Sequence, residues 1–137
     1  MKRKISFILA LAILVVSLVP VSLLADNVTP RYNNIASTST SFRISGDGTA
    51  TVCVGYFGYT NVTTGATINV TIEKRNLLVF WSDVVNDTFT VSGDEYDNEF
   101  TYQLEKTGTY RCTVEYTISG TGGASDVVTF EDTKTYE

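Results

Sequence analysis

The chain has 137 residues, with 15 aspartates and glutamates against 10 lysines and arginines, and it contains no histidine. The resulting net charge of −5 repels phosphate backbones, so we expect no nucleic-acid partner. Without histidine, the chain lacks the usual general base of enzymes, the serine and cysteine triads and most zinc sites.

The N-terminal segment differs in kind from the remainder. Three basic residues at positions 2–4 precede an apolar run over 5–24 that ends at Ala25, which is the pattern of a secretory signal peptide. We expect residues 1–25 to be removed and the remaining chain to be secreted. That removal leaves 7 basic residues and a net charge of −8. About 20 apolar residues can also span a bilayer, so we expect membrane association only if the segment is not cleaved.

The mature chain has the length of one domain. Residues 26–41 are polar and predict an N-terminal arm, followed by a β-domain over 42–137. Phe42 and Ile44 alternate with polar residues and indicate a first edge strand, which Gly46-Asp47-Gly48 ends in a turn.

The second strand, over 49–59, has an ambiguous register. Its even positions from Ala50 to Tyr56 are apolar and form one face, but Cys53 falls on the other face. Either the strand is apolar on both faces or a bulge near Gly55 shifts the register. Both alternatives remain open from the sequence.

The middle of the chain continues the strand pattern. Alternation over 68–72 predicts a third strand, and the continuous apolar run 77–81, Leu-Leu-Val-Phe-Trp, suits a strand covered on both faces. The other interpretation of this run is a contact face that meets a partner or a second copy. A short strand at 89–91 and an acidic loop over 92–99 follow.

The last third predicts strands over 100–104, 108–118 and 128–130. In the strand over 108–118, the even positions from Tyr110 to Ile118 are apolar, whereas the odd positions are polar or charged. That pattern indicates one buried face and one solvated face. With turn signals at regular intervals, the whole predicts an all-β fold: an antiparallel two-sheet sandwich of about seven strands.

The spacing Tyr110-x-Cys112 just after a turn resembles the tyrosine corner of immunoglobulin-like sandwiches. The pattern over 49–118 is similar to an immunoglobulin or fibronectin type III domain, and the resemblance places Cys53 and Cys112 on paired strands. It therefore implies a disulfide, which an exported protein can keep. Trp81 lies much further from Cys53 than the core tryptophan of antibody-type domains does, so loop recognition of the antibody kind is not implied.

The mature chain also resembles small exported β-proteins of Gram-positive bacteria. The resemblance rests on the motifs PRYNNI, GTYRCTV and TKTYE. That group has no assigned activity, so the resemblance implies architecture and location only.

Two kinds of site have candidate residues. The acidic loop offers oxygen ligands for calcium, although a solvated loop explains the same residues; they are Asp94, Glu95, Asp97 and Glu99. Aromatic and apolar side chains could contact a ligand or partner, although burial in the core is the default for rings. These contact candidates are Tyr56, Phe57, Tyr59, Leu78, Phe80 and Trp81.

We therefore expect a secreted, non-catalytic binding module whose partner is an extracellular protein or a cell-surface glycan. A protein contact would use the run around Leu78 to Trp81. A carbohydrate-binding module would instead stack sugars on Phe57, Tyr59 and Trp81. The third alternative, a hydrolase with paired carboxylates, is the least favoured because the acidic residues are scattered through turns.

Overall fold

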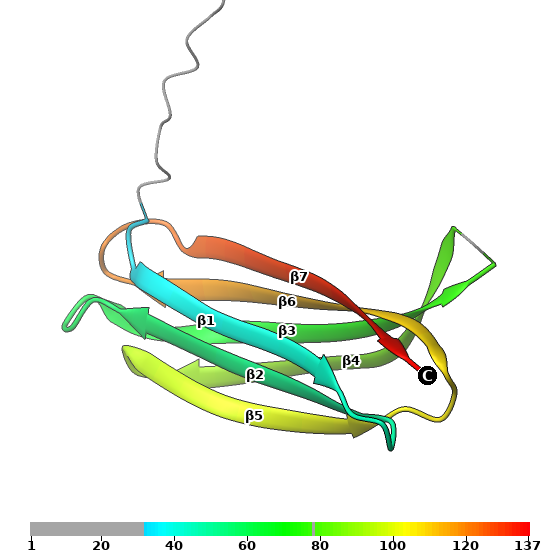
Figure 1. The fold of residues 1–137 in the computed structure, drawn as a ribbon. Coiled ribbons are helices and arrows are strands. Elements are labelled where there is room, and N and C mark those ends of the chain that lie inside the picture. Colours follow the sequence, from blue (N-terminus) through cyan, green and yellow to red (C-terminus); the bar gives the residue numbers. More distant parts are fainter. Residues whose placement is uncertain (1–31, 78) are drawn as a thin grey trace, which may run out of the picture. The chain divides into compact units, whose positions relative to one another are not determined.

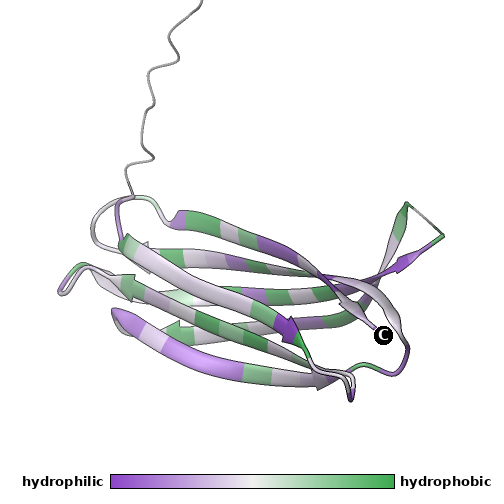
Figure 2. Ribbon diagram, in the orientation of Figure 1, coloured by the Kyte–Doolittle hydropathy of each residue, from purple (hydrophilic) through white to green (hydrophobic). Residues whose placement is uncertain are grey.

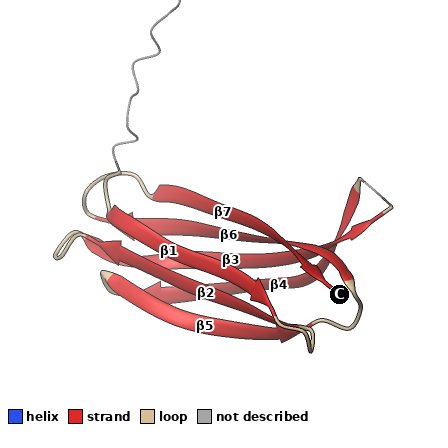
Figure 3. Ribbon diagram, viewed as in Figure 1, coloured by secondary structure: helices blue, strands red, loops and turns tan. Residues whose placement is uncertain are grey.

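The structure is a computed structural model, and it describes residues 32–77 and 79–137. The expected signal peptide, residues 1–25, lies outside the described residues. The described residues form strands and connections only (Figure 3). They include no helix that is long and apolar enough to cross a membrane. The strands are β1 (Ile35–Ile44), β2 (Thr49–Gly58), β3 (Thr63–Asn76), β4 (Phe80–Ser92), β5 (Glu95–Gln103), β6 (Gly108–Gly120) and β7 (Asp126–Tyr136).

The seven strands form two antiparallel sheets packed face to face (Figure 1). One sheet has the order β1-β2-β5 and the other has the order β4-β3-β6-β7. The sandwich predicted from the sequence is therefore confirmed. In constant-type immunoglobulin domains the fourth strand pairs within the sheet of the first, second and fifth strands, whereas here β4 pairs with β3.

The core lies between the sheets and follows the alternation of the sequence. On β2, the predicted face of Ala50, Val52, Val54 and Tyr56 is fully buried. The even positions of β3 and β6, from Ile68 to Ile72 and from Tyr110 to Ile118, supply the opposing layer. No register shift occurs along β2 between Ser37↔Phe57 and Ile44↔Ala50, so the bulge considered near Gly55 is absent.

The N-terminal part of β1 is fixed by a buried carboxylate at the start of β7. Asp126 accepts hydrogen bonds from the backbone N–H groups of Asn33, Asn34 and Ile35. The Asn34 side chain donates to the carbonyl of Ala124 at 2.9 Å, and the Thr63 hydroxyl donates to the carbonyl of Asn34. These contacts tie β1 to strands of the other sheet.

Three boundaries differ from the sequence prediction. Strand β1 begins at Ile35, inside the segment 26–41 that we expected to be an arm: its serines face outward on an edge strand, whereas its threonines are half-buried on the opposite face. Residues 80–81 of the first expected strand and the whole of the second, 89–91, belong to one strand, β4, which has a register shift opposite Ile72 and Glu73. The expected acidic loop is largely strand β5.

Candidate functional site

The most exposed apolar surface lies at the tip of the β3–β4 hairpin. Leu77 is 87% exposed, Val79 is 69% exposed and Phe80 is 67% exposed. The hairpin extends beyond the rest of the sandwich, and its end is coloured as hydrophobic (Figures 1 and 2). Of the two interpretations of the run 77–81, the covered core strand is wrong, because Leu77 and Val79 lie in a turn and Phe80, which begins β4, is exposed. Leu78 lies outside the described residues.

Trp81 stands directly behind the tip on the outer face of the β4-β3-β6-β7 sheet. The guanidinium carbon of Arg111 lies 4.4 Å from the centre of the Trp81 ring, and that of Arg75 lies 6.0 Å from it. Arg111 also forms an ion pair with Glu73, at 2.6 Å between Nη2 and Oε2. The indole is therefore half-buried under a guanidinium group and is not a free stacking platform.

A pocket of about 420 Å³ opens beside the hairpin. It lies between the hairpin and the connection from β5 to β6, and two lysines stand on its wall. Gly108 has a φ of +143°, and a Cβ atom there would meet the Lys74 side chain at 2.8 Å, so glycine leaves room for that lysine. The pocket is lined by Lys74, Asn76, Ser82, Val84, Gln103, Glu105, Lys106 and Tyr110.

The aromatic candidates on β2 divide between core and surface. Tyr56 is fully buried, and its hydroxyl donates to the carbonyl of Gly93 at 2.9 Å; burial, then the nearby Asp94, raises the pKa of this hydroxyl. Tyr56 is therefore a core residue rather than a contact residue. Phe57 is 53% exposed and Tyr59 is 44% exposed.

The exposed aromatics do not form one platform. Phe57 and Tyr59 lie where β2 ends, whereas Trp81 lies at the hairpin end of the sandwich (Figure 1). The expected three-ring surface of Phe57, Tyr59 and Trp81 is therefore wrong in its grouping. Phe57 instead lines a second pocket, of about 400 Å³, with Glu95, Tyr96 and Asp97.

The acidic candidates do not converge on an ion. Glu95, Asp97 and Glu99 alternate along β5 with inward side chains, so their carboxylates follow one another along an extended strand, and Asp94 lies in the preceding turn. Within residues 32–77 and 79–137, no three histidine, cysteine, aspartate or glutamate side chains are grouped as they are around a metal. Calcium binding by a loop, one of the two interpretations of these residues, is therefore wrong, because an extended strand separates carboxylates that a loop would bring together.

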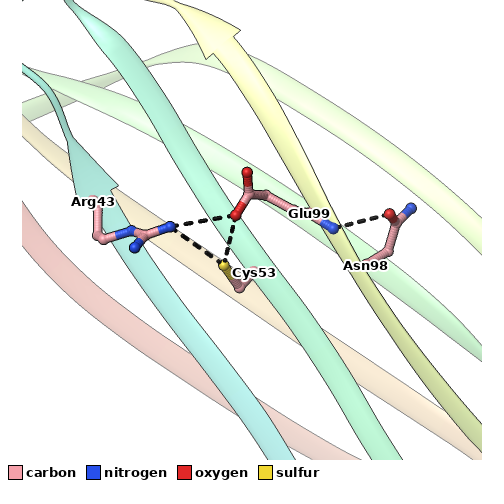
Figure 4. Close-up of polar contacts among 4 residues, drawn as sticks. All are labelled: Arg43, Cys53, Asn98 and Glu99. Atoms are coloured by element: carbon pink, nitrogen blue, oxygen red, sulfur yellow. Dashed lines mark hydrogen bonds and ion pairs between the residues drawn. The ribbon is translucent and has the colours of Figure 1, made fainter.

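The two cysteines are free thiols, so the expected disulfide is absent. Cys53 lies on the outer face of the β1-β2-β5 sheet. Its thiol is 3.4 Å from Glu99 Oε2, and Arg43 Nη2 lies 3.9 Å from Sγ (Figure 4). Cys112 lies fully buried in the core, on β6. A disulfide requires Cβ atoms that point toward each other. Here Cys112 points into the core and Cys53 points away from it, so the β1-β2-β5 sheet lies between the two thiols.

Tyr110 makes the hydrogen bond expected of a tyrosine corner. Its hydroxyl donates to the backbone carbonyl of Lys106, in the connection between β5 and β6. Burial raises the pKa of the Tyr110 hydroxyl, and the bond to Lys106 opposes that rise. The contact is structural, and it fixes the corner that carries Lys106 beside the first pocket.

No protein-family model, curated protein or solved structure matches this chain.

The sequence named the run 77–81 as a possible contact face, but two residues of the same end were missed: Lys74 and Lys106. The available signal was the polar sequence Lys-Arg-Asn directly before the apolar run. These three polar residues continue strand β3, so the turn to β4 falls within the apolar run itself.

Proposed function

We propose that this chain is a secreted, non-catalytic binding module that attaches to a cell surface through the tip of its β3–β4 hairpin. The observation that carries the proposal is the exposure of Leu77, Val79 and Phe80 side by side. Burying a side chain of this kind gains about 1.5–3 kcal/mol. A contact that covers the tip recovers a stabilisation that the isolated domain leaves unused.

An immunoglobulin-like relationship is part of the proposal. The first, second and fifth strands share one sheet opposite the third, sixth and seventh, as in immunoglobulin domains, and Tyr110 supplies the corner. The difference from constant-type immunoglobulin domains is that β4 pairs with β3. The proposal that the chain is secreted depends on the sequence pattern of residues 1–25. The two free thiols do not support it, because a disulfide is what an oxidising exterior would favour.

The test is retention of residues 26–137 on intact cells and on isolated envelope fractions of the producing organism. All seven strands and the core lie within this segment. We expect the variant Leu77→Ser/Val79→Ser/Phe80→Ser to lose retention. The matched control, Phe57→Ser/Val127→Ser, removes exposed apolar surface elsewhere (Val127 is 57% exposed) and should keep it. Equal retention of the two variants would contradict the proposal.

A second candidate function is glycan binding at the opposite end. It is favoured by the pocket that Phe57 shares with Glu95, Tyr96 and Asp97, because sugar sites combine an aromatic face with polar groups that fix orientation. In that case retention on polysaccharide fractions is lost in the variants Phe57→Ala and Tyr59→Ala. The hairpin variant keeps it, so the same experiment separates the two functions.

A further inference from the structure

The apolar tip is small and convex. The described part of it consists of Leu77, Val79 and Phe80 at the end of a projecting hairpin (Figure 2). A specific protein interface usually covers about 800 Å² on each partner, with roughly 20–30 residues a side. Insertion into lipid needs no such area, because each apolar side chain that leaves water contributes by itself.

Most of the described cations lie at the same end of the molecule, where the carboxylates include those of Glu73, Asp83, Glu105 and Asp132. Apart from Arg43, every lysine and arginine of the described residues lies near the hairpin end of the β4-β3-β6-β7 sheet. Arg111 and Lys134 are paired with Glu73 and Asp132. The cations without an ion pair among the described residues are Lys74, Arg75 and Lys106.

The order of these groups along the hairpin matches the layers of a bilayer surface. The apolar tip comes first, the cross-strand pair of Trp81 and Arg75 comes next, and Lys74 and Lys106 stand behind it on β3 and at the β5–β6 connection. Apolar side chains favour the acyl region, whereas tryptophan and cationic side chains favour the headgroup level. Glu105 also lines the pocket with Lys74 and Lys106 and reduces its net charge.

We propose that the hairpin tip inserts into the surface of a lipid bilayer, with Lys74, Arg75 and Lys106 meeting the phosphates of the lipid headgroups. This inference rests on the proposed function, because it names the partner of the same surface. It also gives the chain a route to membranes that is independent of residues 1–25.

The test uses residues 26–137 and vesicles of phosphatidylcholine, with and without phosphatidylglycerol. Trp81 is the only tryptophan of the chain and follows the tip by one residue, so it reports insertion. We expect its emission to move to shorter wavelength on addition of vesicles and to be quenched by brominated acyl chains. Sedimentation with the vesicles gives the partition coefficient.

The variants separate the two contributions. Leu77→Ser/Val79→Ser/Phe80→Ser should lower partitioning more than about 30-fold, since each side chain loses its transfer from water. Each of Lys74→Gln, Arg75→Gln and Lys106→Gln should lower it about 5-fold on anionic vesicles at low salt and have little effect on phosphatidylcholine. The control Phe57→Ser/Val127→Ser should bind as the unaltered protein does.

Three outcomes would overturn the inference: no partitioning, partitioning that the tip variant retains, and a Trp81 shift that depends on protein concentration without vesicles. The last would assign the tip to a second copy of the chain. If vesicles fail while cell retention still requires the tip, the lipid inference is wrong and the proposed function stands. If cell retention is also independent of the tip, both are wrong.

Discussion

The Oδ2 atom of Asp126 lies 2.6 Å from the backbone nitrogen of Asn34. The same buried carboxylate accepts bonds from the N–H groups of Asn33, at 2.9 Å, and Ile35, at 3.2 Å. We expect Asp126→Ala to lower the free energy of unfolding by about 3 kcal/mol, because charged hydrogen bonds are lost and buried donors are left unpaired. Urea denaturation measures this change. Asp97→Ala, on the exposed face of β5, should change stability by less than about 0.5 kcal/mol, and equal losses in the two variants would show that the clamp contributes nothing.

Loss of the hydroxyl group should destabilise the domain at Tyr110 but not at Tyr102. Tyr110 donates to the Lys106 carbonyl, so Tyr110→Phe should destabilise the domain by about 1 kcal/mol. The Tyr102 hydroxyl is buried and makes no hydrogen bond of good geometry with a described residue; its pKa is raised by burial, then by a weaker approach of the hydroxyl to the Asp87 carboxylate. Tyr102→Phe should therefore be neutral or stabilising. Thermal unfolding compares them, and a loss in Tyr102→Phe as large as that in Tyr110→Phe would contradict the prediction.

Asp47 should contribute a stability that depends on acid pH. Its Oδ1 atom accepts hydrogen bonds from the Ser45 hydroxyl, at 2.6 Å, and from the Thr49 N–H, at 2.9 Å, which lower its pKa from 3.8 to about 2. A folded-state pKa below the unfolded value means that the stabilisation is complete above pH 3.8 and disappears as the pH falls to about 2. The difference in unfolding free energy between the unaltered protein and Asp47→Asn should close over that window. A difference that stays constant down to pH 2 would refute the assignment.

The two thiols should differ in reactivity. Burial, then the nearby Asp132 carboxylate, raises the pKa of Cys112 to about 12, and the thiolate is the reactive form. Iodoacetamide at neutral pH should therefore modify Cys53 in the folded protein and Cys112 only after denaturation, as read by peptide mass spectrometry. Cys112→Ser serves as the control that assigns the slow site. Recovery of a peptide pair linked through Cys53 and Cys112 from protein kept oxidised would contradict the structure.

The alternation of the sequence was sufficient to predict the sandwich and most of its core. The even positions of β2, β3 and β6 are apolar and buried, because a strand places successive side chains on opposite faces. The position of Cys53 on the odd face of β2 already argued against a disulfide with Cys112. The resemblance to immunoglobulin domains suggested the bridge, and the register of this chain excludes it.

The candidate site was harder to predict, because the apolar run 77–81 has no periodicity that separates a covered strand from an exposed turn. What decides its environment is the length of β3 and β4, which carry the run beyond the opposing sheet. The prediction of a loop for the acidic residues 94–99 was wrong because their polarity hid a strand. Tyr96 and Phe100, however, pack against the core and mark the inner face of an edge strand.

The Asp126 clamp and the hairpin tip lie at opposite ends of the sandwich (Figure 1). Strand β3 covers that distance with 14 residues, which corresponds to roughly 45 Å at about 3.3 Å per residue. A partner bound at the tip would therefore lie roughly that distance from the end of the domain that holds Asn33 and Asp126.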